Sequence, residues 1–131
     1  MPSTETPYLF VYGTLRRAAL ERAHELLAGR ATLIGMGCFQ GRLYDLGRYP
    51  GAVASTNRTD RVYGEIYRLR QSAAVFERLD RYEGEYFARR WMRVRHGTGD
   101  KIFSWVYLYR GRVKDAQRIR SGDYLKFLAR A

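Results

Sequence analysis

Cysteine is nearly absent from this chain of 131 residues, in which Cys38 stands alone. A lone cysteine excludes a disulfide scaffold and a zinc site built on several thiolates, and we take it as pointing to the cytoplasm. Long apolar runs are missing too, since no stretch approaches the roughly 18 apolar residues of a membrane span. Residues 1–7 carry neither a basic start nor an apolar run, so we expect no signal peptide and no membrane partner.

The common catalytic and nucleotide-binding motifs are missing as well. The chain has no Gly-x-Ser-x-Gly, no Cys-x-x-Cys and no Walker lysine loop. Residues 35–41, GMGCFQG, resemble a dinucleotide fingerprint only superficially, because the third glycine comes one residue late and no strand–turn–helix surrounds them. His24 and His96 are isolated, which is typical of surface or packing residues, and Cys38 is expected to be a small core hydrophobe.

Acidic residues are scarce relative to basic ones: 13 against 24, a formal net charge of +11. Such an excess raises the question of nucleic acid. The arginines are spread along the chain in ones and twos, however, and no basic run is interleaved with aromatic residues. We therefore do not expect a nucleic-acid partner, and a mobility-shift titration at two salt concentrations tests this expectation. A basic surface can instead attract acidic small-molecule substrates.

Hydrophobic residues make up 46% of the chain, enough to bury one core, so we expect a single domain over residues 1–131. Hydrophobic patterning predicts strands over 8–12, 61–69, 86–95 and 102–109, with strand-like pieces over 31–46. It predicts helices over 18–28, over about 71–83 with Ser72 as N-cap, and after Ser121-Gly122-Asp123, and a turn at Tyr49-Pro50-Gly51. Five or six clustered strands favour an α+β fold around a curved, mostly antiparallel sheet or barrel.

The first candidate site is Tyr12-Gly13-Thr14-Leu15, at the end of the first predicted strand. A turn through Gly13 can aim successive backbone N–H groups at one point, and such a concavity binds carboxylates or oxyanions. The partial positive charge of the following helix N-terminus adds to the attraction. An ordinary strand-to-helix turn would leave the same pattern.

The second candidate is Glu83. Phe76, Leu79 and Glu83 follow one another at i, i+3 and i+7, so the carboxylate falls on the buried side of its helix, in the last turn before Gly84. Loss of water and the negative helix end both favour the protonated form, so we expect a raised pKa suited to general acid–base work. The alternative is a structural salt bridge to Arg89 or Arg90. Asp80 and Glu85 are expected to be solvated.

Several ordered blocks together resemble the γ-glutamylcyclotransferase-like family, which includes AIG2-like proteins. The resemblance begins in LFVYGTLR (9–16), whose centre is similar to the family's YGT/SL signature. It continues in residues 41–44, 49–51, 62–67, 79–84 with Tyr86 and Arg89-Arg90, 106–109 and 119–124. The resemblance spans about residues 8–128, almost the whole chain.

This resemblance implies a mixed β-barrel with flanking helices and a pocket between them. The backbone of Tyr12, Gly13, Thr14 and Leu15 would hold the α-carboxylate and amine end of a γ-glutamyl group. Glu83 matches the catalytic glutamate, which would move a proton while the α-amine attacks its own γ-carbonyl and releases 5-oxoproline. The resemblance implies neither a metal nor an organic cofactor, and it allows a homodimer.

Tyrosines and a proline complete the expected pocket. Tyr86, Tyr107 and Tyr109 could supply hydroxyls, or they could simply pack in a barrel wall. Pro50 and Gly51 could shape the pocket rim or only form a turn. A rival hypothesis for the whole protein is a noncatalytic module that binds small ligands on the same scaffold.

Overall fold

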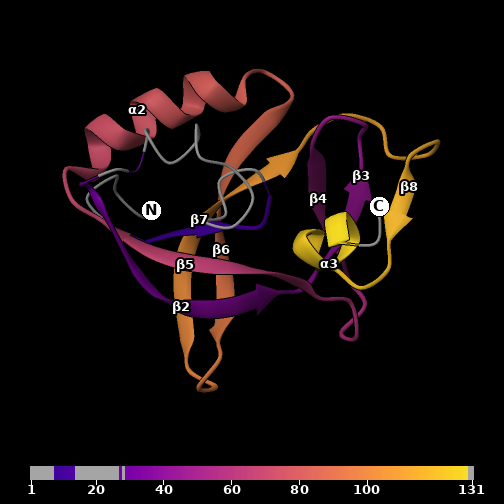
Figure 1. Cartoon of the computed structure of the whole chain (residues 1–131), viewed down its shortest axis with the longest axis horizontal. Helices are drawn as coiled ribbons and strands as arrows, with labels where there is room; N and C mark the ends of the chain where they lie inside the picture. The colour runs from indigo at the N-terminus through magenta and orange to yellow at the C-terminus, as the bar shows by residue number, and fades with distance from the viewer. Residues whose placement is uncertain (1–7, 14–26, 28, 130–131) are drawn as a thin grey trace.

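The protein folds into a closed five-stranded barrel beside a smaller three-stranded sheet (Figure 1). The computed structural model describes residues 8–13, 27 and 29–129. The barrel strands run in the order β1 (Tyr8–Val11), β5 (Val62–Leu69), β2 (Ala31–Phe39), β6 (Phe87–His96) and β7 (Lys101–Tyr109). The small sheet has the order β4 (Pro50–Ala54), β3 (Gly41–Asp45) and β8 (Gln117–Ile119). Two helices are described, α2 (Ser72–Glu83) and α3 (Tyr124–Ala129). The predicted α+β class is therefore confirmed.

Strand β1 closes the barrel, because it pairs antiparallel with β5 and parallel with β7. Every other described strand pair is antiparallel, as the sequence predicted. Side chains alternate between the two faces of a strand, so β1 serves two cores. Phe10 packs with Ile66 and Val106 in one core, whereas Leu9 and Val11 belong to the other. This double burial explains why residues 8–12 read as a continuous apolar run.

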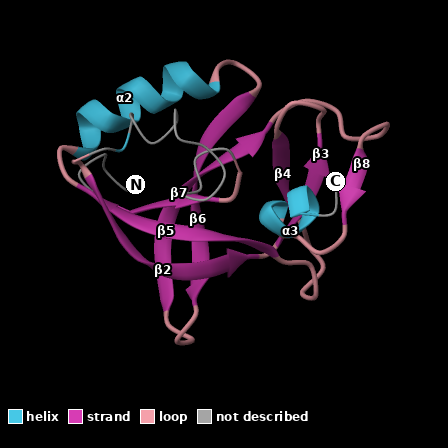
Figure 2. Cartoon of the chain, in the orientation of Figure 1, coloured by secondary structure: helices cyan, strands magenta, loops and turns pink. Residues whose placement is uncertain are grey.

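Helix α2 lies across one side of the barrel (Figure 2). Its residues Val75, Phe76 and Leu79 are almost completely buried and share the core that contains Leu9 and Val11. The last turn of α2 is thereby held close to the barrel, near the point where β1 ends. Neither described helix is long and apolar enough to cross a membrane.

Several local predictions need correction. Ser72 is the first residue of α2 rather than its N-cap, a position that Gln71 occupies with a left-handed φ of 53°. Pro50 and Gly51 do not form a turn but begin β4, where a proline as the first strand residue sacrifices no internal ladder bond. Cys38 is half-buried in β2 instead of lying in the core.

Other local predictions fall outside the described residues or are confirmed. The helix predicted over 18–28 and His24 lie outside the described part of the chain, apart from the buried Leu27. The strands predicted over 86–95 and 102–109 are present as β6 and β7, which pair as a hairpin whose loop lies between His96 and Lys101. Asp123 opens α3 as expected, because its Oδ1 accepts the backbone N–H groups of Leu125 and Lys126 at 3.0 and 3.3 Å.

A buried carboxylate, Asp60, ties the small sheet together. Its Oδ2 accepts Arg42 Nε at 2.7 Å and Ser55 Oγ at 2.5 Å, and its Oδ1 accepts Arg118 Nη2 at 2.9 Å. These hydrogen bonds, that of Ser55 first, hold the pKa of Asp60 well below its usual range. Arg42 lies on β3 and Arg118 on β8, so one carboxylate bridges two neighbouring strands.

Asp60→Asn is expected to lower the urea midpoint of unfolding at neutral pH, because the amide cannot pair with both guanidinium groups. A lowered pKa adds stability above the unfolded value and loses it as the pH falls through the folded value. The difference from the wild type should therefore shrink as the solution is acidified. Asp115→Asn, at an exposed loop position, is the control and should leave the midpoint unchanged. A gap that does not vary with pH would contradict this account.

Candidate functional site

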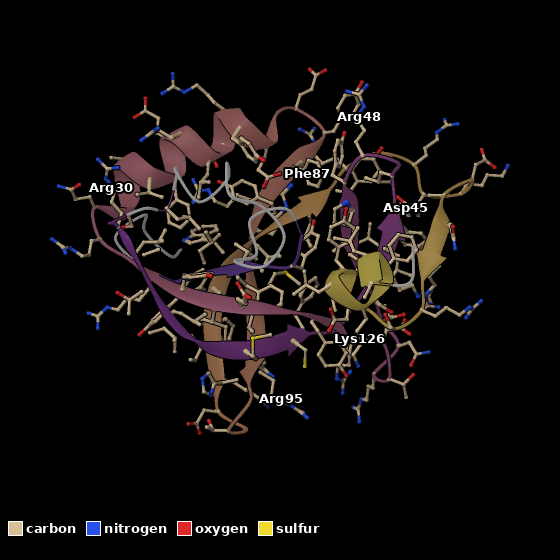
Figure 3. All side chains as sticks on the ribbon, viewed as in Figure 1. Arg30, Asp45, Arg48, Phe87, Arg95 and Lys126 are labelled. Atoms are coloured by element: carbon tan, nitrogen blue, oxygen red, sulfur yellow. The ribbon has the colours of Figure 1, made fainter. Side chains whose placement is uncertain are left out.

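A pocket of about 480 Å³ opens where β1 ends. It lies among the last turn of α2, the beginning of β6 and the turn between β3 and β4. Figure 3 labels two of its lining residues, Arg48 from that turn and Phe87 from β6. The lining consists of Phe10, Val11, Tyr12, Gly13, Arg48, Tyr49, Pro50, Tyr82, Glu83, Phe87 and Tyr107. Apart from Arg48 and Glu83, these residues are tyrosines and apolar residues, which is typical of a small-molecule site.

Glu83 is the acidic residue of this pocket. It is the last residue of α2, and Gly84 caps the helix with φ 78° and donates its N–H to the Asp80 carbonyl at 3.1 Å. Burial raises the pKa of the Glu83 carboxyl to about 7. Within the described residues, neither a hydrogen bond nor an ion pair holds this carboxyl. It can therefore exchange a proton with a bound ligand near neutral pH.

Arg89, one of the two arginines expected to neutralise Glu83, has another partner. Arg89 makes a bidentate pair with Asp80, with Nε to Oδ1 at 2.9 Å and Nη2 to Oδ2 at 3.2 Å. The guanidinium also lies over the rings of Phe76 and Trp105, at 4.4 and 4.6 Å from their centroids. The sequence suggested that Asp80 is simply solvated, whereas the structure pairs its carboxylate with Arg89. This clamp fixes the last turn of α2 against β6 and β7 and directs Arg89 to Asp80 instead of Glu83.

Tyr107 belongs to the same clamp. Its hydroxyl donates to Asp80 Oδ1 at 2.6 Å, and burial, reinforced by Asp80, raises the pKa of this phenol. The ring lines the pocket, while the hydroxyl is already engaged. We therefore assign Tyr107 to the shape of the pocket and to the positioning of α2.

Tyr12 locks the end of β1 in a comparable way. Its buried hydroxyl donates to the Tyr107 carbonyl at 2.6 Å and accepts the Ala52 N–H at 3.1 Å. Burial raises the pKa of Tyr12 far above its usual value. Because Ala52 lies on β4 and Tyr107 on β7, this single hydroxyl joins the barrel to the small sheet at the pocket.

Gly13 is fitted closely against the neighbouring sheet. A Cβ at this position would lie 2.6 Å from Pro50 Cγ, so only glycine lets the chain pass here without displacing β4. The backbone at Tyr12 and Gly13 thus forms one wall of the pocket, and Pro50 faces it. Thr14 and Leu15, the other members of the predicted cradle, lie outside the described residues.

The structure brings together Tyr12, Gly13, Glu83 and Tyr107, together with Pro50 from the expected rim. It does not place Tyr86 in the lining, since that side chain is 57% exposed. Tyr109 packs against Phe87, with ring centroids 5.5 Å apart, and is not part of the lining either.

Six lining residues were not singled out as site residues from the sequence: Phe10, Val11, Arg48, Tyr49, Tyr82 and Phe87. Four of them, Phe10, Val11, Tyr49 and Tyr82, lie inside motif blocks that carry the family resemblance, and Arg48 and Phe87 each lie next to such a block. Membership of a motif block, or a place beside one, was the signal in the sequence that could have found them. Among the described residues, no group of three His, Cys, Asp or Glu side chains could hold a metal ion.

The sequence model of the family described as "Gamma-glutamyl cyclotransferase, AIG2-like" matches residues 9–126. This range contains every described residue of the pocket. The chain belongs to this family. The resemblance seen in the sequence motifs is thereby confirmed. Membership of this family supports the function of a γ-glutamylcyclotransferase-like enzyme.

Individual relatives agree with the family assignment. The chain is 34% identical over 120 residues to the "Gamma-glutamylcyclotransferase family protein YtfP" of Escherichia coli K12, covering 89% of this chain and 95% of the relative. The solution structure of E. coli ytfP superposes with a TM-score of 0.64 at 30% identity, covering 92% of this chain and 97% of the other. An AIG2-like protein from mouse has the same fold, with a TM-score of 0.68 at 24% identity, covering 81% and 79% of the two chains.

Proposed function

We propose that this protein converts a γ-glutamyl amino acid or amine into 5-oxoproline and the free amino acid or amine. The observation that carries the proposal is the shielded carboxyl of Glu83, which pairs with none of the described residues and whose pKa burial raises to about 7 inside a small-molecule pocket. At neutral pH such a group exists in both protonation states. It can therefore accept a proton in one step and return it in the next.

The reaction is an intramolecular acyl transfer. The substrate's α-amine forms a C–N bond with its own γ-carbonyl carbon while the Glu83 carboxylate takes a proton from the attacking nitrogen. The tetrahedral intermediate then breaks the bond to the leaving nitrogen, which receives that proton from the Glu83 carboxyl. Neither water nor a nucleophilic side chain is consumed. The protein's task is to fold the substrate and to move one proton.

The pocket suits this task in size and lining. Its volume of about 480 Å³ lies within the range of ordinary ligand pockets, and a γ-glutamyl group is a small ligand. We assign the backbone at Tyr12 and Gly13 to the α-carboxylate and amine end of the substrate. Phe87, Tyr49 and the rings of Tyr82 and Tyr107 would restrict the chain to folded conformations.

The test is 5-oxoproline release from γ-glutamylalanine, γ-glutamylethylamine and glutathione. We expect release from at least one of them and none from α-glutamylalanine, whose α-amine cannot reach an activated γ-carbonyl. If γ-glutamyl compounds bind without any release of 5-oxoproline, the protein is a noncatalytic module instead. Release from the α-linked isomer would contradict the proposed chemistry.

A further inference from the structure

Arg48 is the only lining residue of the pocket, among those the structure describes, that carries a fixed positive charge. It is exposed, in the turn between β3 and β4, whereas Glu83 comes from α2. Within the described residues, no carboxylate lies within ion-pair distance of this guanidinium. The nearest acid in sequence, Asp45, uses its Oδ1 to accept the Gly47 N–H at 2.9 Å.

The backbone that carries Arg48 is well fixed. The Leu46 N–H donates to the Tyr49 carbonyl at 3.0 Å, and Gly47 supplies the positive φ, 103°, that this tight turn requires. The Tyr49 ring then packs on Phe87, with centroids 5.8 Å apart. Since both rings line the pocket, the turn presents Arg48 at the pocket wall while its long side chain reaches solvent.

The two classes of substrate differ in one group that such a residue can distinguish. A γ-glutamyl amino acid carries a second carboxylate on its leaving group, and a γ-glutamyl alkylamine has none there. A guanidinium binds a carboxylate with two parallel hydrogen bonds, which adds both energy and orientation. The α-carboxylate common to both classes is already assigned to the backbone at Tyr12 and Gly13.

We propose that Arg48 binds the carboxylate of the leaving amino acid and so makes this protein selective for γ-glutamyl amino acids over γ-glutamyl amines. This inference rests on the proposed function, because it names the leaving group for the same pocket. Glu83 acts at the scissile bond, and Arg48 holds the far end of the substrate.

Binding is measured by calorimetry in a Glu83→Gln background, which separates affinity from turnover. The probes are γ-glutamylalanine and γ-glutamylethylamine, at low and at raised ionic strength. Adding Arg48→Ala is expected to weaken binding of γ-glutamylalanine by about tenfold, the value of one charge-assisted contact, and to leave γ-glutamylethylamine within about twofold. Salt should weaken only the first ligand. Arg48→Lys keeps the charge but loses the planar guanidinium that makes two parallel hydrogen bonds, so it should give an intermediate affinity.

Arg112→Ala is the matched control, since Arg112 is also exposed and lies outside the pocket. Equal weakening of both ligands by Arg48→Ala, or no weakening of either, would overturn the role of Arg48 and leave the proposed function standing. If neither ligand binds even the protein with Arg48 intact, and the wild type releases no 5-oxoproline, the proposed function fails and the inference fails with it.

Discussion

Glu83→Gln is expected to lower kcat for 5-oxoproline release by about a thousandfold or more. The amide is nearly isosteric with the protonated carboxyl, but it can neither take a proton from the attacking amine nor return one to the leaving nitrogen. KM should change little, because the contacts that hold the substrate remain. The measurement is steady-state kinetics on the best substrate of the panel, with Glu85→Gln, exposed and two residues away, as the control.

The pH dependence should follow the same group. Burial raises the pKa of Glu83 to about 7, so the base form that starts the reaction disappears as the pH falls below that value. The wild type should therefore lose kcat/KM in weak acid, whereas the residual rate of Glu83→Gln should not show this step. Near-wild-type turnover by Glu83→Gln would remove Glu83 from the mechanism.

Glu83→Gln should also stabilise the folded protein at basic pH. This result would show that the variant loses turnover without losing its fold. Between its ordinary value of 4.5 and about 7, the folded chain holds the Glu83 proton more tightly than the unfolded chain does. Stability is therefore lost as the pH rises through this window. Because glutamine does not titrate, the variant should be more stable than the wild type above pH 7, by about 3 kcal/mol. Urea unfolding on both sides of the window measures this difference.

Glu83 shows what the sequence can predict. Spacing on one helix placed its carboxylate on the buried side, and the direction of its pKa shift followed from that side alone. Burial is the cause of the shift. The salt bridge from Glu83 to Arg89 was wrong for a tertiary reason: Arg89 pairs with Asp80, an arrangement that depends on β6 packing against α2. No pattern within either segment contains that information.

Strands were predicted correctly where the pattern within the segment decides the structure, and missed where pairing with another segment decides it. Long strands with clear alternation, such as β5 and β7, were predicted within one or two residues. Strands β4 and β8 were not, because PGAVA and QRI are short and lack alternation, and they become strands by pairing with β3. The place of Arg48 in the pocket could not be predicted for the same reason, because it also depends on tertiary packing. Its place is decided by how the small sheet docks on the barrel, through contacts such as Tyr12 to Ala52.

Gly64→Ala is expected to destabilise the protein by about 3 kcal/mol or more, through overpacking that the barrel cannot relieve. Gly64 lies on β5, opposite the end of β1. A Cβ there would overlap the carbonyl oxygen of Val11 and lie 2.8 Å from Phe10 Cζ. In an ordinary strand, replacing glycine by alanine is neutral or helpful. A large loss of stability can therefore be attributed to the close approach of β1 at this position. Thermal or urea unfolding measures it.

Gly97→Ala is the matched control, because the nearest atom to its Cβ would be the Met36 carbonyl oxygen at an ordinary 3.6 Å. It should change stability by no more than about 0.5 kcal/mol. The crowded Val11 is the residue before Tyr12, so any Gly64→Ala protein that still folds must shift the backbone that forms the pocket wall. Its kcat/KM should fall even at temperatures where it is fully folded. A variant as stable and as active as the wild type would mean that β1 can move away from β5 without disturbing the site.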